Sequence, residues 1–183
     1  MRVVVAYASK YGGTREIAER IANVFRGAGL PAQARSVLLL ANVESYGAII
    51  LGSAVYMGRW QADASDFVRR NKAALSERPL WLFSSGPLGT ERLAADGREV
   101  VAQAEPAEIA GYRESLRPRD HKVFFGALKH DALTLPHRVI AALPVGRGLL
   151  PDGDFRDWSA IEAWAREIAA ELVPLNVPAF AEV

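Results

Sequence analysis

Short apolar runs alternate along the chain with longer segments in which apolar residues recur every three or four positions. The short runs have the length and the β-branched or aromatic content of strands. They predict five strands, over residues 2–8, 31–37, 46–52, 79–85 and 122–128. Residues 2–8 and 46–52 are apolar almost throughout, as strands buried on both faces of a sheet are. Residues 31–37 are more polar, which favours an edge strand.

The longer segments predict amphipathic helices between these strands. The first begins near residue 13, and Gly29 is its expected C-terminal cap. Its apolar positions, four, four and three residues apart, are Ile17, Ile21, Phe25 and Ala28. A second helix is expected over 61–75, a longer helical region before the last strand, and a final helix over 157–172. Asp157 can cap this final helix, and Ser159 with Glu162 offers a capping box one turn later.

Strands that alternate with helices predict an α/β fold with a parallel sheet covered on both faces. Right-handed crossovers with one reversal of winding predict a flavodoxin-like, doubly wound, five-stranded sheet of order 2-1-3-4-5. Ligands of such sheets bind beyond the carboxyl ends of the strands, next to the switch point. We expect one domain over residues 1–173, with an inserted segment over about 129–151 before the final helix and a C-terminal tail over 174–183.

Composition restricts the classes of function. The 183 residues are 50% hydrophobic, enough for one core, and 22 Lys and Arg balance 21 Asp and Glu. This balance argues against nucleic acid as a partner. The absence of Cys excludes disulfides and thiolate chemistry. No apolar run approaches the roughly 18 residues of a membrane span, and the N-terminus does not resemble a signal peptide. A cytoplasmic location is expected.

The first strand runs directly into a polar loop, and the first helix follows. Candidate ligand-binding residues in this loop are Ser9, Lys10, Tyr11, Gly12, Gly13 and Thr14. The two glycines let the backbone approach a ligand, while free amides and the helix dipole favour a phosphate. The spacing fits neither G-x-x-x-x-G-K-[ST] nor G-x-G-x-x-G. A strand-to-helix turn with nothing bound remains the alternative.

Two further loops, 52–60 and 84–90, are expected to open on the same edge of the sheet. Their small residues suit a backbone wrapped closely around a flat polar ring. The candidates in them are Ser53, Ala54, Val55, Tyr56, Ser84, Ser85, Gly86 and Gly89. Tyr56 and Trp60 could stack on that ring. Ordinary packing is the alternative for both aromatic residues.

These loops resemble those of the flavodoxin family. The S-x-x-G-x-T pattern at 9–14 matches the FMN phosphate loop of that family, and "LGSAVYMG" and "FSSGPLG" resemble the loops that flank its isoalloxazine. The resemblance covers residues 1–127 and implies FMN as the cofactor, with Tyr56 against the ring. Lys10 and Tyr11 replace the common Thr residues of the family, so two hydroxyls are missing from the phosphate loop.

A narrower resemblance is to the flavodoxin-like branch that includes menaquinone-dependent protoporphyrinogen dehydrogenase. It is carried by the phosphate loop, "LGSAVYMGRW", "DHKVFFGAL" and "GDFRDWSAIEAWAREIA", and by the inserted segment. It implies oxidation of a porphyrinogen, as in heme biosynthesis, with a quinone as acceptor. Basic residues of the insertion, Lys129, Arg138 and Arg147, suit an anionic substrate or an anionic membrane. His130 and His137 are candidates for proton transfer, and a lid over the sheet end is the alternative for the segment.

Three functions remain open. The first is an FMN oxidoreductase, because we expect neither a Ser-His-Asp set nor paired carboxylates nor a metal site to offer competing chemistry. The second is a flavodoxin-type electron shuttle, which the near-neutral charge disfavours, since such shuttles are commonly acidic. The third is a flavin-free binding module. Expected partners are a small redox substrate, a quinone, a membrane surface and a second copy of the chain.

Overall fold

A parallel sheet forms the centre of the protein. The computed structural model describes residues 1–135 and 150–176. Its sheet contains β1 (Val3–Ala8), β2 (Ala32–Ser36), β3 (Ala48–Tyr56), β5 (Leu80–Ser85) and β6 (Asp120–Phe124). The order is β2-β1-β3-β5-β6, and every neighbouring pair on this path is parallel. The doubly wound order predicted from the sequence is thus confirmed.

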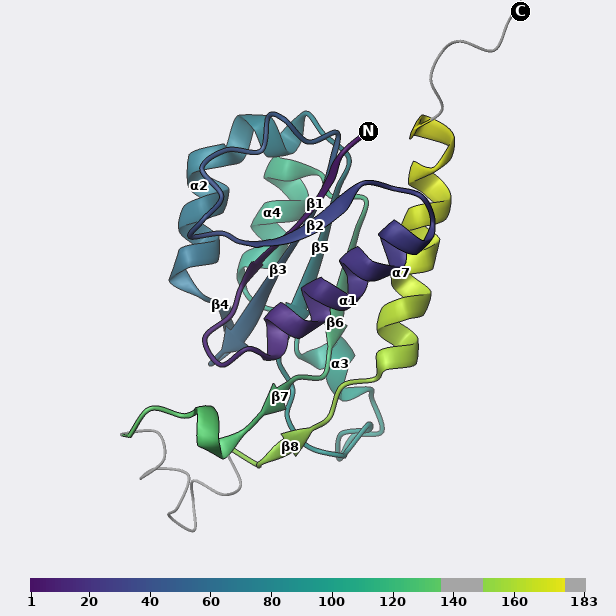
Figure 1. Cartoon of the computed structure of the whole chain (residues 1–183). Coiled ribbons are helices and arrows are strands. Elements are labelled where there is room, and N and C mark those ends of the chain that lie inside the picture. The colour runs from purple at the N-terminus through teal and green to yellow at the C-terminus, as the bar shows by residue number, and fades with distance from the viewer. Residues whose placement is uncertain (136–149, 177–183) are drawn as a thin grey trace, which may run out of the picture.

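Helices cover both faces of the sheet (Figure 1). On one face lie α1 (Gly13–Gly27) and α7 (Trp158–Leu172), and on the other lie α2 (Ala62–Ser76) and α4 (Glu108–Leu116). Side chains along β1 alternate between the two cores: Val3 and Val5 face α1 and α7, while Val4 faces α2 and α4. This alternation follows from the period of two in a strand. A short helix, α3 (Val100–Gln103), precedes α4.

Gly29 ends the first helix, as expected from the sequence. Its φ of 80° lies in the left-handed region, which glycine adopts without steric cost. Its amide donates to the Arg26 carbonyl, and the Leu30 amide donates to the Phe25 carbonyl. This pair of bonds is the Schellman motif, which satisfies the last carbonyls of the helix. The turn directs the chain into the edge strand β2. At the far end of the chain, Asp157 caps α7 by accepting from the Ala160 amide.

The prediction of a loop over residues 52–60 is wrong in its first part, which belongs to strand β3. Residues 53–56 continue β3 beyond the predicted end at residue 52. They form a hairpin with β4 (Arg59–Trp60). Met57 and Gly58 make the turn, with φ of 51° and 72°. Two positive φ values in succession are typical of a two-residue type I′ hairpin. The hairpin holds Tyr56 in a fixed position at the sheet edge.

The last strand is displaced from its predicted position over 122–128. It begins at Asp120, because an edge strand need not be apolar, and it ends at Phe124. The chain then forms β7 (Ala127–Leu128), which pairs antiparallel with β8 (Gly153–Asp154). This pair is called the β7–β8 ribbon below. Two short 3-10 turns, η1 (His130–Ala132) and η2 (Pro174–Asn176), follow β7 and α7.

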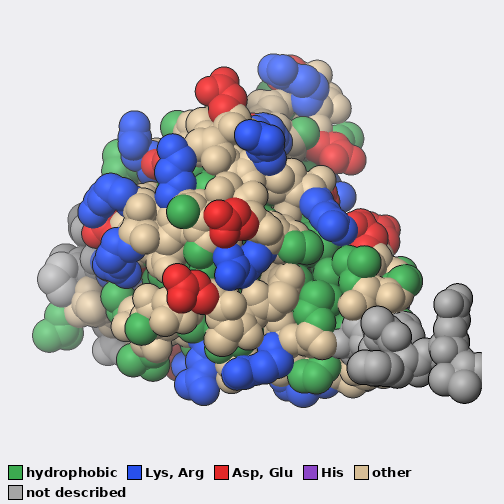
Figure 2. All heavy atoms as spheres, turned by 90° about the horizontal axis from the view of Figure 1, so that it is seen from above, with side chains coloured by type: hydrophobic (Ala, Val, Ile, Leu, Met, Phe, Trp, Pro, Cys, Tyr) green, Lys and Arg blue, Asp and Glu red, His purple; other side chains and the backbone are tan. Residues whose placement is uncertain are grey.

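The amino ends of the strands form a face of mixed charge. Seen from above, basic side chains gather along the left and lower edges of this face, and acidic, apolar and small residues lie among and beside them (Figure 2). A shallow depression there is bordered by charges of both signs, from Arg2, Glu44, Glu77 and Arg78. Ligands of doubly wound sheets bind at the opposite, carboxyl edge of the strands.

Candidate functional site

A cavity of about 630 Å³ opens at the carboxyl edge of the sheet, within the usual size range for small-molecule sites. Three segments that are distant in sequence meet around it: the loop after β1, the end of β3 with its hairpin, and the loop after β5. The described residues that line it are Ser9, Lys10, Tyr11, Gly13, Thr14, Ala54, Val55, Tyr56, Met57, Ser85, Gly86, Leu88, Gly126, Ala127, Leu128, Leu133 and Leu150. The cavity therefore has a polar end at the start of α1, and an apolar wall of leucine residues adjoins it.

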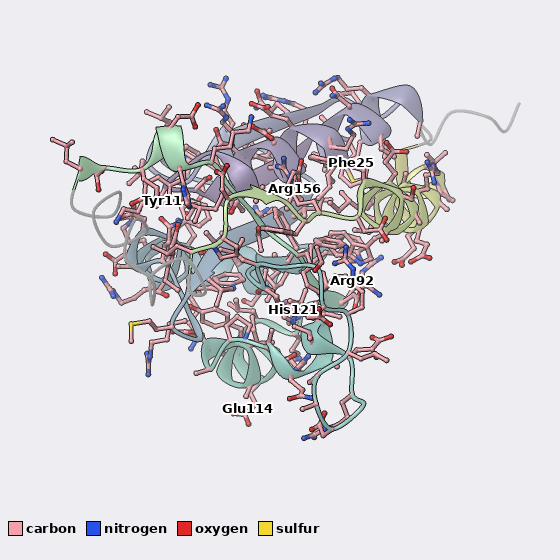
Figure 3. The ribbon with its side chains drawn as sticks, turned by 90° about the horizontal axis from the view of Figure 1, so that it is seen from below. Tyr11, Phe25, Arg92, Glu114, His121 and Arg156 are labelled. Atoms are coloured by element: carbon pink, nitrogen blue, oxygen red, sulfur yellow. The ribbon has the colours of Figure 1, made fainter. Side chains whose placement is uncertain are left out.

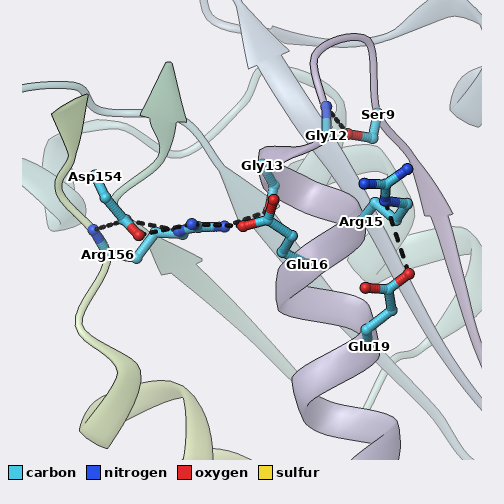
Figure 4. Close-up of polar contacts among 8 residues, drawn as sticks. All are labelled: Ser9, Gly12, Gly13, Arg15, Glu16, Glu19, Asp154 and Arg156. Atoms are coloured by element: carbon cyan, nitrogen blue, oxygen red, sulfur yellow. Dashed lines mark hydrogen bonds and ion pairs between the residues drawn. The ribbon is translucent and has the colours of Figure 1, made fainter. Parts of the chain in front are cut away.

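The polar end is built by the loop between β1 and α1. Gly12 has φ of 91°, and its amide donates to Ser9 Oγ over 3.1 Å, which closes the loop tightly (Figure 4). The first amides of a helix have no intrahelical acceptor, and no side chain caps those of α1. Thr14 faces the cavity although only 2% of the residue is exposed. Unshared amides at a helix N-terminus suit an anionic group.

Lys10 and Tyr11 stand where a flavodoxin phosphate loop commonly carries Thr. The Lys10 ammonium lies 5.5 Å from the centre of the Tyr11 ring. The Tyr11 ring itself packs against the small apolar cluster of Leu128 and Leu133. A cation and backbone amides thus replace two hydroxyls at this end of the cavity. The donor set remains suited to a phosphate.

Tyr56 lies at the rim of the cavity, at the last position of β3. It is 41% exposed, and its neighbour Met57 at the turn is fully exposed. Burial of the hydroxyl, with a further contribution from the charge of Tyr11, raises the pKa of Tyr56 to about 12. The phenol therefore stays neutral and can donate a hydrogen bond over the physiological pH range. A neutral ring at the rim can also lie against a flat ligand.

Not every predicted site residue lines the cavity. Gly12, Ser53, Ser84 and Gly89 do not. Ser53 is fully buried, where its hydroxyl donates to the Ala54 carbonyl and accepts from the Gln61 amide. Gly89 has φ of 114° and serves the turn after β5.

The stacking role considered for Trp60 is wrong. Only 4% of its surface is exposed, and its ring packs at 5.4 Å, centre to centre, against Tyr112 of α4. Its Nε1 donates to Ser84 Oγ over 2.8 Å. Trp60 therefore joins the hairpin to the core below the cavity.

Ser84 belongs to a Ser-His-acid arrangement that the sequence did not lead us to expect. Ser84 Oγ lies 2.8 Å from His121 Nε2, and His121 Nδ1 lies 3.2 Å from Glu105 Oε2. The Glu105 carboxylate can only accept, so a neutral His121 donates from Nδ1 and accepts the Ser84 hydroxyl proton at Nε2. Ser84 Oγ in turn accepts from the indole of Trp60. Ser84 is fully buried and lines no part of the cavity, so the arrangement serves the fold.

His121 gives stability a pH dependence. Its side chain is 1% exposed, and burial lowers its pKa, although Glu105 and Asp120 oppose this and Arg113 adds to it. The unfolded chain therefore binds a proton more readily, and stability is lost as the pH falls below 6.5. We expect the free energy of unfolding to decrease between pH 7.5 and 5.5, by at most about 1.4 kcal/mol per pH unit.

Urea unfolding at several pH values measures this effect. His121→Gln is expected to flatten the pH dependence, whereas the control His130→Gln should keep the slope of the wild type. A slope that is the same in wild type and His121→Gln would exclude His121 as its source.

The apolar wall contains most of the lining residues that sequence reasoning missed. They are Met57, Leu88, Gly126, Ala127, Leu128 and Leu150. Leu128 and Leu133 form a small buried cluster with Leu88 and Leu150 packed against it. The one sequence signal for this wall was the apolar content of the inserted segment, to which Leu133 belongs.

The inserted segment is described only at its two ends. His130 joins them: its amide donates to Asp152 Oδ1, and its Nε2 donates to the Leu150 carbonyl, each over 2.7 Å. Lys129 is exposed beside it. The predicted residues His137, Arg138 and Arg147 lie outside the described residues. A structural role thus accounts for His130, and the geometry gives no support for proton transfer by it.

Neither a group of metal-ligating side chains nor a helix able to span a membrane occurs within residues 1–135 and 150–176. No group of His, Asp and Glu in this part of the chain could hold a metal ion. No helix there is both long and apolar enough to cross a bilayer.

The doubly wound sheet defines an α/β protein, and its cavity lies at the switch point, where proteins of this class bind ligands. The family described as Flavodoxin domain matches residues 4–145. The chain therefore belongs to the flavodoxin family. The comparison with curated sequences gave no match.

Solved structures of the same fold include flavodoxins from several organisms. A flavodoxin from the domain Archaea is 15% identical with a TM-score of 0.58, and 94% of this chain covers 99% of that one. Oxidised flavodoxin 1 from Bacillus cereus is 16% identical with a TM-score of 0.58 and the same coverage. The rubredoxin oxygen:oxidoreductase of Desulfovibrio gigas is 15% identical with a TM-score of 0.59, and 96% of this chain covers 37% of that chain. At these identities the likeness concerns the fold.

Proposed function

We propose that this protein binds FMN and uses it to oxidise an organic substrate, with a quinone as the electron acceptor. The observation that carries the proposal is the cavity at the carboxyl edge, which joins an uncapped helix N-terminus to an apolar wall. Membership of the flavodoxin family supports a flavin as the ligand. The specific reaction we favour is porphyrinogen oxidation, on the sequence resemblance to that branch.

The residues around the cavity fit FMN. The amides of Gly13 and Thr14, with Lys10 nearby, would hold the phosphate. Ala54 and Tyr56 on one side and Ser85 and Gly86 on the other would flank the ring system. FMN would supply transfer of one or two electrons, while the chain supplies binding, orientation and exclusion of water. Tyr56, neutral up to a pKa of about 12, would offer a hydrogen-bond donor and a flat face.

An electron shuttle of the flavodoxin type is the second candidate. The match in length to flavodoxins favours it, since each covers nearly all of the other. Against it stand the apolar residues Leu88, Leu133 and Leu150, which extend the cavity beyond the polar end. Such a wall suits a flat apolar substrate held against the flavin, whereas a shuttle needs only an exposed flavin edge. The nearly equal numbers of acidic and basic residues also favour the enzyme.

The visible spectrum of the purified protein, followed by anaerobic redox assays, tests the proposal. We expect a bound flavin that is released as FMN on denaturation. Reduction by a porphyrinogen and reoxidation by a menaquinone analogue are expected within seconds. The matched variant is Leu88→Ser, which changes the apolar wall at a partly buried position of the loop after β5, outside the phosphate loop; it should retain FMN and lose most of the turnover.

Each outcome discriminates between the candidates. A protein that binds FMN but exchanges electrons only with other redox proteins would be a shuttle. A folded protein that binds neither FMN nor riboflavin would support the flavin-free module. We further propose that Lys129 and its neighbours contact an anionic substrate or membrane, which binding to anionic and neutral vesicles would test.

A further inference from the structure

A buried guanidinium joins the β7–β8 ribbon to the beginning of α1. The side chain of Arg156 is 2% exposed, although it lies close to the carboxyl edge (Figure 3). Its Nε and Nη2 donate to the two carboxylate oxygens of Asp154, each over 2.7 Å. The Trp158 ring lies 4.3 Å from the guanidinium carbon and covers it. This bidentate pair of hydrogen bonds fixes the orientation of the planar guanidinium.

The remaining donors of Arg156 reach the first turn of α1 (Figure 4). Nη1 donates to the Gly13 carbonyl over 3.0 Å, and Nη2 donates to Glu16 Oε2 over 2.7 Å. The Gly13 carbonyl and the Thr14 amide belong to one planar trans peptide, so they point in opposite directions. Fixing the carbonyl against Arg156 therefore fixes the direction of the Thr14 amide at the polar end of the cavity.

Arg156 also sets the charge around this turn. It lies between the carboxylates of Asp154 and Glu16, each within 2.7 Å of its guanidinium. Its hydrogen bonds lower the pKa of Asp154, so this carboxylate is charged at neutral pH. Without the guanidinium, two carboxylates would remain unneutralised next to the helix N-terminus. They would repel any anion placed there.

The backbone confirms how closely the ribbon and the loop fit. A Cβ at Gly13 would lie 3.0 Å from the Ala127 carbonyl oxygen, a closer contact than most Cβ atoms make, so any larger residue here would push β7 away from the loop. The Phe155 amide donates to the Gly126 carbonyl and holds the two sides of the ribbon together. Any movement of the ribbon would therefore be transmitted to the Gly13 peptide.

We propose that Arg156 is the positioning residue for the phosphate end of the cofactor site. It orients the Thr14 amide through the Gly13 carbonyl and neutralises Glu16 beside it, from a position outside the cavity. The inference rests on the proposed function, because the phosphate in question is that of FMN. From the sequence alone, the role expected in this part of the chain was the cap of the final helix by Asp157.

Comparing FMN with riboflavin, which lacks the phosphate, tests this role in the full-length protein. Arg156→Gln is expected to weaken FMN binding about 10-fold or more, while riboflavin affinity changes less than about twofold. Arg156→Lys keeps the positive charge but cannot make the bidentate pair of hydrogen bonds. Its FMN affinity should lie between those of Arg156→Gln and the wild type. Arg20→Gln is the matched control, because Arg20 also covers Trp158, at 5.0 Å, and pairs with Glu162 on α7. It should leave both affinities unchanged.

Fluorescence titration gives both dissociation constants, and melting of the flavin-free protein reports stability separately. Equal losses of FMN and riboflavin affinity in Arg156→Gln, or no loss of either, would overturn the positioning role alone. If Arg156→Gln does not fold, the FMN-to-riboflavin ratio of Arg156→Lys decides in the same way. A wild-type protein that binds neither flavin would overturn the proposed function, and this role with it.

Discussion

Replacing Thr14 by Asp is expected to lower FMN affinity by at least about 100-fold. Thr14 faces the polar end of the cavity at the start of α1, where the phosphate of FMN would lie. Two negative charges about 4 Å apart repel each other by roughly 4 kcal/mol near a protein surface. Folding should survive, because a carboxylate is favourable in the first turn of a helix.

Thr14→Asn is the matched control, since asparagine has nearly the same shape as aspartate but carries no charge. It should retain FMN binding within a few-fold, and both variants should bind riboflavin as the wild type does. Dissociation constants from fluorescence titration, with melting curves of the flavin-free proteins, measure these effects. Wild-type FMN affinity in Thr14→Asp would show that the phosphate does not lie on this loop.

Replacing Gly52 by Ala is expected to destabilise the fold by about 2–3 kcal/mol. A Cβ at Gly52 would lie 2.0 Å from Cζ of Phe83, its partner across β3 and β5. Phe83 is fully buried, with Phe124 at 6.4 Å and Trp164 at 6.3 Å between ring centres. Its ring has no free space to move into, so overpacking must distort the centre of the sheet.

The free energy of unfolding in urea measures this loss. Gly111→Ala in α4 is the control, because a Cβ added there would meet nothing within 4 Å and the helix should gain about 0.5–1 kcal/mol. Combining Gly52→Ala with Phe83→Leu should restore part of the stability. A loss below about 0.5 kcal/mol in Gly52→Ala would contradict the close contact.

Much of the fold was predictable because its signals are local. Strands buried on both faces are apolar throughout, helices repeat at 3.6 residues, and a right-handed crossover restricts the strand order. The loop at 9–14 was recognisable for the same reason, since its glycines and its position before a helix are adjacent in sequence. The hairpin at Met57 and Gly58 was missed because methionine is an unusual residue at a positive φ.

Other features depend on residues that only folding brings together. Ser84 and His121 are 37 positions apart, and the sequence placed Ser84 both at the end of a predicted strand and at the start of a ligand-binding loop. Its hydroxyl is buried because Trp60 and His121 pack against it. The end of β6 at Phe124 also depends on tertiary structure, because the chain leaves the sheet there and β7 pairs with β8, 25 to 27 residues later.

By itself the sequence determined the strand order, the edge of the sheet that carries the cavity and the loop suited to an anion. Each of these follows from hydrophobic period, crossover handedness and turn chemistry over a few neighbouring residues. Only the tertiary structure decided which side chains face that cavity and which lie beneath it. It alone placed Arg156 against the Gly13 carbonyl, 143 positions away. The apolar period shows which face of an element packs, but it does not show which residue of another element that face will meet.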